Sequence, residues 1–141
     1  MIEKFSDYEG GNYIDQEGEF NFEITGAELM DSKSGNLMVK FDLKAPEGST
    51  TVYHVLTPKA RWTYNRLISA ALALTDEQKK SFELDYETIH NQLVGKHVLT
   101  TVYAESYVKE IKKPMEDGTY QTSEEERIGY KVDTTSYKPV V

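Results

Sequence analysis

The sequence predicts a mainly β fold with a helical insert, and three observations support this class. Three stretches in the first 56 residues either alternate apolar and polar side chains or are rich in β-branched and aromatic residues. A helical segment follows, and strand-like sequence then returns. This is the order of an OB-fold, a five-stranded, partly open β-barrel with its helix between the third and fourth strands. We therefore expect an OB-like barrel.

The first three expected strands are separated by short turns. Residues 17–25 place their aromatic and aliphatic side chains on one face of a strand. Residues 37–44 alternate in the same way and follow a Ser-Gly-Asn turn, in which Gly35 can take the positive φ angle that a tight turn requires. Residues 50–56 are rich in β-branched and aromatic residues. Together they predict a meander.

The helical segment is expected to contain three pieces. Thr57 is a suitable N-cap for a first helix over residues 58–74, because proline is favoured at the first helical position. The sequence Thr75–Gln78 matches a capping box and begins a short second helix. A third piece, residues 86–93, follows Asp85 as its N-cap.

The remaining sequence predicts strands on either side of a hairpin turn. Residues 97–104 and 106–113 have strand character, and Asp117-Gly118 is a typical turn sequence. The acidic run at 123–126 is expected to be a solvated loop, and residues 127–135 form the last candidate strand.

The totals predict one soluble domain. A chain of 141 residues fits a single domain, here with a flexible acidic N-terminus of about residues 1–12 and an extended C-terminal tail of about 135–141. The absence of cysteine excludes disulfides and thiolate metal sites and suits a reducing compartment. No apolar run approaches the ~20 residues that span a bilayer, and the N-terminus lacks the pattern of a signal peptide. We expect a cytoplasmic protein that does not interact with membranes.

The net charge of -8 conceals an uneven distribution. Residues 1–32 contain nine acidic residues and one lysine, whereas residues 33–72 contain six basic and two acidic residues. An acidic total generally disfavours nucleic-acid binding, but the central segment is basic.

A search for catalytic motifs supports no enzyme class. His54, His90 and His97 stand in no metal-ligand spacing, and ordinary packing or surface positions explain them. The chain also lacks a nucleophile elbow, a Walker-type loop and a dinucleotide-binding glycine motif. We expect no catalysis, no cofactor and no metal.

The sequence does contain what single-stranded nucleic-acid binding requires, namely cations for the phosphates and exposed rings for the bases. An OB-fold binds its ligand across strands two and three, between the loops that join strands one to two and four to five. The candidate residues at these places are Lys33, Lys40, Lys44, Tyr53, Tyr107, Lys109, Lys112 and Lys113.

Simpler structural explanations of these residues stay open. Lys40 and Lys44 alternate with Asp42, so a salt-bridged solvent face explains them equally well. Tyr53 could equally pack in the barrel.

Two further candidates, Lys59 and Arg61, fall in the first turn of the main helix, where the helix dipole disfavours cations. A bound anion would offset this effect, and exposure to water is the alternative. Trp62 beside them is expected to be a core anchor, with a position near the anion as the second interpretation.

The runs GEFNFEITGAELMDSKSGNLMVKFDLKAPEG and LVGKHVLTTVYAESY resemble small phage proteins of replication and recombination modules, a family of unknown function. The resemblance covers residues 12–113 and rests on the Ser-Gly-Asn turn with its following strand and on Val94-Gly95-Lys96. Some phage proteins of this kind are OB-fold single-stranded DNA-binding proteins. The resemblance implies a phage accessory protein in the host cytoplasm that coats single-stranded DNA and cooperates with a recombinase or replication protein. It also implies roles for Lys33, Lys40 and Lys96.

We therefore expect a non-enzymatic protein that binds single-stranded DNA with little sequence preference. The alternatives are an acidic protein-interaction module, favoured by the net charge, and a small hydrolase. The chain ends in SYKPVV, whereas bacterial single-stranded DNA-binding proteins end in an acidic tail, so tail-mediated recruitment is not expected. Self-association, which would multiply the binding site, is left open.

Overall fold

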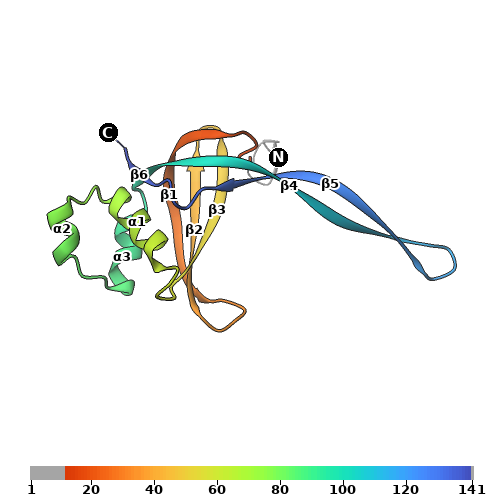
Figure 1. Cartoon of the computed structure of the whole chain (residues 1–141), viewed down its shortest axis with the longest axis horizontal. Helices are drawn as coiled ribbons and strands as arrows, with labels where there is room; N and C mark the ends of the chain where they lie inside the picture. Colours follow the sequence, from red (N-terminus) through yellow and green to blue (C-terminus); the bar gives the residue numbers. More distant parts are fainter. Residues whose placement is uncertain (1–11, 141) are drawn as a thin grey trace, which may run out of the picture.

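A six-stranded antiparallel sheet forms the centre of the computed structural model, which describes residues 12–140 (Figure 1). Three helices follow the third strand and lie together at one end of the molecule (Figure 1). The strands are β1 (Gly18–Asp31), β2 (Leu37–Ala45), β3 (Gly48–Val55), β4 (His97–Pro114), β5 (Tyr120–Val132) and β6 (Lys138–Pro139). The helices are α1 (Arg61–Ala71), α2 (Asp76–Ser81) and α3 (Tyr86–Leu93).

The sheet is open. Its strand order is β3-β2-β1-β4-β5, and β6 also pairs with β4. The two outer strands, β3 and β5, contact each other without forming a hydrogen-bonded ladder. The predicted class, mainly β with helices between the third and fourth strands, is confirmed at this level.

A β-bulge divides β1 into two halves. The pairing with β2 shifts between Ile24 and Gly26, so that one extra residue, Thr25, has no partner. Because side chains alternate with a period of two, this extra residue changes which positions face the core. Phe22 and Ile24 point inward before the bulge, and Ala27 packs against the same core after it.

The inner face of the sheet packs against α1 and α3. Buried side chains come from strands β1 to β5, from α1 and α3, from Ile14 before β1 and from Tyr137 in the C-terminal segment. The largest of them are Tyr64, Phe22, Phe41, Ile24, Leu43, Leu67, Ile68 and Leu93. The helical spacing of Tyr64, Leu67, Ile68, Ala71 and Leu74 predicts the core face of the first helix. The first four are buried in α1, whereas Leu74 follows the end of the helix and is only partly buried.

A buried histidine connects three parts of the chain. Nδ1 of His54 on β3 lies 3.0 Å from the hydroxyl of Thr63 on α1, and Nε2 lies 2.8 Å from the hydroxyl of Tyr137. Neutral imidazole has one donor and one acceptor nitrogen, and a hydroxyl can complement either. In the neutral ring, one hydroxyl accepts a hydrogen bond and the other donates one. In the protonated ring, both hydroxyls would have to accept.

The main helix is shorter than predicted. It begins at Arg61, and its N-cap is Ala60, which makes no side-chain cap hydrogen bond. Thr57 instead accepts hydrogen bonds from the N–H of Ala60, through both its carbonyl and its hydroxyl, and so closes a turn before the helix. The predicted capping box of Thr75 and Gln78 and the Asp85 cap are both confirmed.

Two predictions for the second half of the sheet were wrong. The stretches 97–104 and 106–113 form one continuous strand, β4. The acidic run 123–126 is part of β5, where it pairs with β4, although its side chains are exposed as predicted. The hairpin turn at Asp117-Gly118 is confirmed, with Gly118 at a φ of 83°.

The C-terminal segment is tied to the core. Tyr137 is buried, and β6 pairs with Val98 and Leu99 of β4, so the segment that was predicted as an extended tail is anchored to the sheet. Of the predicted flexible N-terminus, residues 1–11 lie outside the described residues. Among residues 12–140, no helix has the length and apolar character needed to cross a membrane.

The free energy of unfolding should decrease as the pH falls from about 6.5 toward about 4. Burial lowers the pKa of His54 to about 4 and also lowers the pKa of His90. The folded state therefore binds fewer protons than the unfolded chain in this range, and protonation favours unfolding. The expected contribution of His54 is about 3 kcal/mol.

Urea denaturation at a series of pH values measures the slope of the free energy of unfolding against pH. The variant His54→Gln, which cannot titrate, should reduce it. An unchanged slope in His54→Gln would contradict the assignment.

Candidate nucleic-acid interface

The register of the sheet places Lys40 between two defined neighbours on the outer face. It pairs with Tyr53 on β3 and with Glu28 on β1. Directly paired residues on neighbouring strands have their side chains on the same face. The ring of Tyr53 is 54% exposed, so the alternative that it packs in the core is excluded. The structure thus brings together a lysine and an exposed aromatic ring that were both predicted to bind DNA.

None of the predicted lysines forms a salt bridge among residues 12–140, although Glu28 is the direct cross-strand neighbour of Lys40. Five salt bridges occur in this part of the chain, and none includes a predicted site residue. Asp42 accepts a hydrogen bond from the hydroxyl of Thr51 at 3.2 Å and forms no ion pair with Lys40 or Lys44. The predicted alternative, an outer face neutralised by salt bridges to Asp42, is therefore not what the structure shows.

Lys44 lies in a less favourable environment for a phosphate. It pairs with Glu23 and Ser49 and lines a surface hollow of about 600 Å³ together with Glu23, Glu47 and His97. Two carboxylates in the same hollow disfavour an anion there. The end of β2 that carries Lys40 is the better candidate.

Two more predicted lysines come from connections at the Lys40 end of the sheet. Lys33 is exposed in the turn between β1 and β2, and Lys59 is exposed in the connection between β3 and α1. Both connections lie at the lower end of the sheet in Figure 1. The N–H of Leu56 donates to the carbonyl of Leu37 at 2.8 Å, which holds the start of the second connection beside β2.

Arg61 and Trp62 differ from their predictions. The guanidinium of Arg61 lies over the ring of Tyr86 on α3, 5.5 Å from its centroid, and donates a hydrogen bond to its hydroxyl. Arg61 therefore joins α1 to α3 and is not a free cation at the helix N-terminus. Trp62 was expected to anchor the core, but it is 52% exposed.

Lys96 lies apart from these residues. It is exposed in the turn between α3 and β4, where its N–H donates to the carbonyl of Leu93 and its carbonyl accepts from the N–H of Ile24. These backbone bonds give the Val-Gly-Lys sequence a structural role, with Gly95 at a φ of 91°.

The other predicted residues lie on a two-stranded arm. We define the arm as residues 105–129, the part of the β4–β5 hairpin in which no side chain is buried. It projects away from the end of the sheet that holds the helices (Figure 1). Tyr107, Lys109, Lys112 and Lys113 lie in the predicted strand 106–113 beside the hairpin turn, which is part of β4 within this arm.

The arm has two faces of opposite character. Tyr107, Lys109 and Lys113 share one face with Arg127, which pairs with Tyr107. The ring of Tyr107 rests on Gly129, where a Cβ atom would lie 3.3 Å from the ring. This face carries three of the predicted residues, together with Glu125, which pairs with Lys109 and forms an ion pair with Arg127. Alternation places Lys112 on the other side.

The second face of the arm is acidic and apolar. Glu110 pairs directly with Glu124, and Val108 pairs with Glu126. Val108 and Ile128 are each 62% exposed on this face. Two like charges in direct opposition destabilise a ladder, so the Glu110–Glu124 pair weakens the isolated arm.

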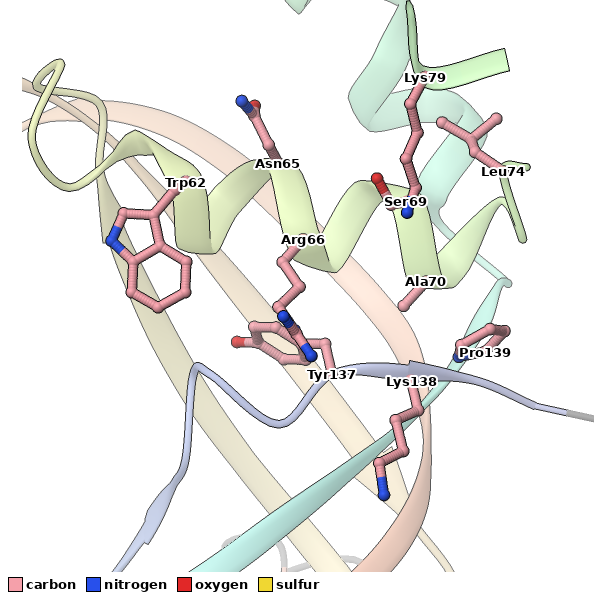
Figure 2. Close-up of a pocket in the computed structure, with 10 residues that line it drawn as sticks. All are labelled: Trp62, Asn65, Arg66, Ser69, Ala70, Leu74, Lys79, Tyr137, Lys138 and Pro139. Carbon is pink, nitrogen blue, oxygen red and sulfur yellow. The ribbon is translucent and has the colours of Figure 1, made fainter. Parts of the chain in front are cut away.

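A pocket between α1, α2 and the C-terminal segment was missed by the sequence analysis (Figure 2). Its volume is about 440 Å³, and its wall includes three cations and no acidic residue. The signal was present in the sequence, because Trp62, Arg66 and Ser69 recur at helical spacing opposite the core face of α1. The lining residues are Trp62, Asn65, Arg66, Ser69, Ala70, Leu74, Lys79, Tyr137, Lys138 and Pro139.

No metal-binding cluster appears in the described part of the chain. Among residues 12–140, no three histidine, aspartate or glutamate side chains lie close enough to hold a metal ion. His54 and His90 are buried among aromatic rings, and their hydrogen bonds go to Thr63, Tyr137 and Tyr64.

Neither a protein-family model nor a curated protein matches this chain. The resemblance to phage replication and recombination proteins therefore stays a prediction.

The two faces of the arm predict opposite effects of charge reversal at neighbouring positions. Glu124→Lys would place a lysine opposite Glu110 and should slow amide hydrogen exchange in the arm, since each cross-strand pair contributes about 0.2–1 kcal/mol. Glu125→Lys is the matched control, because it would face Lys109 and remove the 3.0 Å ion pair with Arg127. It should speed exchange, and equal effects of both changes would contradict the assigned register.

Proposed function

We propose that this protein binds single-stranded DNA with little sequence preference and performs no catalysis. The observation that carries the proposal is the pair Lys40 and Tyr53, a lysine without an ion-pair partner among residues 12–140 beside an exposed ring on the outer face of the sheet. Non-specific binding of a single strand combines phosphate contacts with base stacking on aromatic side chains.

The topology supports an OB-like barrel as the finer description of the fold. The order β3-β2-β1-β4-β5, with the helices between β3 and β4, is compatible with a five-stranded, partly open barrel. In such a barrel the outer face of the second and third strands is the ligand surface, and Lys40 and Tyr53 lie on that face. The arm corresponds to the loop that joins the fourth and fifth strands.

The proposed binding surface extends from the outer face to the basic face of the arm. Lys33 and Lys59 supply further positive charge at the Lys40 end of the sheet, and Tyr107 with Lys109 repeats the combination of ring and cation on the arm. A phage recombinase or replication protein is the proposed functional partner, and self-association of the chain is part of the same hypothesis.

The opposite face of the arm favours a second candidate function, docking of a basic partner protein. Three glutamates, Glu110, Glu124 and Glu126, surround the exposed side chains of Val108 and Ile128. Acidic and apolar groups in alternation complement a partner surface that is basic and apolar.

Fluorescence anisotropy of labelled oligo-dT, with a duplex for comparison, tests the primary proposal at low and moderate salt. Binding to the single strand should weaken steeply as salt rises, because bound lysines displace counterions from the phosphates. Tyr53→Ala should weaken binding roughly 5- to 150-fold, which corresponds to the ~1–3 kcal/mol that one stacked base contributes. Tyr53→Phe retains the ring and should bind as the wild type does.

Lys40→Ala should reduce the salt dependence by about one phosphate contact. Lys80→Ala, at an exposed position of α2 outside the proposed surface, is the matched control. Absence of binding at low salt would refute DNA binding and favour the docking of a basic protein.

A further inference from the structure

The pocket beside Trp62 is built from residues that are free to contact a ligand. Trp62 and Arg66 project from α1 toward the C-terminal segment, and Lys79 of α2 reaches toward Ser69 from the other side (Figure 2). Within residues 12–140, the side chains of Trp62, Arg66 and Ser69 take part in no hydrogen bond or salt bridge. Their donor groups are therefore available.

The charge of the pocket is positive and centred on Arg66. Nζ of Lys79 forms an ion pair with Oδ1 of Asp76 at 3.6 Å. Lys138 points away from α1 (Figure 2), and its Nζ forms an ion pair with Oε2 of Glu19 at 3.3 Å. The pKa of Asp133 is lowered mainly by hydrogen bonds from Thr135 and additionally by the charge of Arg66. Neither Asp76, Glu19 nor Asp133 lines the pocket.

The exposed indole has no structural explanation in the packing of the helix. The core face of α1 is filled by Tyr64, Leu67 and Ile68, and Trp62 lies outside it. A large aromatic ring that is half exposed beside an arginine suits the stacking of a flat, anionic ligand. A nucleotide has both features, because its base is flat and its phosphate is charged.

A single strand of DNA bound on the outer face of the sheet is long enough to reach this pocket. Nine residues separate Tyr53 from Trp62, so their Cα atoms lie at most roughly 30 Å apart. About nine nucleotides at the ~3.4 Å rise of a stacked strand cover that distance. This lies within the ~4–16 nucleotides that one OB-fold occupies. Lys59 is exposed in the connection between the two places.

We propose that the pocket between α1, α2 and the C-terminal segment is a second contact site for the same single strand, in which a base stacks on Trp62 and the adjacent phosphates contact Arg66 and Lys79. This inference rests on the proposed DNA binding and extends the binding surface from the sheet to the helical end of the molecule. The DNA strand then runs along the connection between β3 and α1.

Trp62 is the only tryptophan of the chain, so its fluorescence reports on this pocket alone. The experiment titrates the full chain with oligo-dT of about 30 nucleotides, longer than the ~16 of one site, and records tryptophan emission and anisotropy on the same samples. Emission should fall in parallel with the rise in anisotropy, and added salt should reverse both.

Neighbouring lysines of α2 provide the matched variants. Lys79 lines the pocket and Lys80 does not. Lys79→Ala and Arg66→Ala should each weaken binding several-fold and reduce the salt dependence by about one contact, whereas Lys80→Ala should match the wild type. Trp62→Ala should weaken binding about fivefold or more. Circular dichroism and thermal unfolding of each variant establish that the fold is retained.

The outcomes separate the two proposals. A rise in anisotropy without a change in tryptophan emission would overturn the pocket and leave DNA binding in place. Quenching by a poly-glutamate peptide but not by oligo-dT would also overturn it, and would make the pocket a docking site for an acidic protein segment. No anisotropy change at low salt would overturn both.

Discussion

The hydrogen bonds of His54 hold the sheet, the main helix and the C-terminal segment in one arrangement. The imidazole lies in a cluster of rings, 5.8 Å from Phe41 and 5.7 Å from Tyr137 between centroids. Its two partners belong to α1 and to the segment before β6, which are distant in sequence. A buried polar group costs free energy unless it is satisfied, so the three segments must come together for the ring to be buried at all. Among the described residues, no buried side-chain nitrogen or oxygen lacks a partner.

This constraint also determines the geometry of both proposed contact sites. Thr63, the partner of His54 on α1, is the residue after Trp62, and Tyr53 is the residue before His54. Because neighbours in a strand point to opposite faces, burial of His54 directs Tyr53 outward. The same hydrogen bond that positions α1 therefore sets the distance between the two exposed rings.

The elements that the sequence predicted well depend on local chemistry. The caps at Thr75 and Asp85 and the glycine turns at Gly35 and Gly118 require only a few adjacent residues, and they were predicted correctly. The second half of β1 was missed because the bulge at Thr25 interrupts the alternation on which strand prediction relies.

The predictions that failed depend on tertiary context. Acidic residues are unusual in strands, and nothing local reveals that 123–126 pair with an equally exposed β4. The candidate site also depends on tertiary contacts that the local sequence does not reveal. Alternation placed Lys40 on the outer face, but it left the orientation of Tyr53 open until the register was known. The pocket at Trp62 needs residues from α1, α2 and the C-terminal segment, which only the fold brings together. The contact between Arg61 and Tyr86 was not predicted, because the two residues are 25 positions apart in the sequence.

The arm can unfold locally without unfolding of the core. A two-stranded ribbon without a buried face is marginally stable in water, so residues 105–129 can open while the histidine cluster stays intact. A ligand that lies along Tyr107 and Lys109 must order this ribbon as it binds, and the lost conformational entropy offsets part of the contact enthalpy. Affinity at the arm will therefore depend on the stiffness of the hairpin as well as on its contacts. Substitutions that stiffen the ribbon without touching the ligand will strengthen binding.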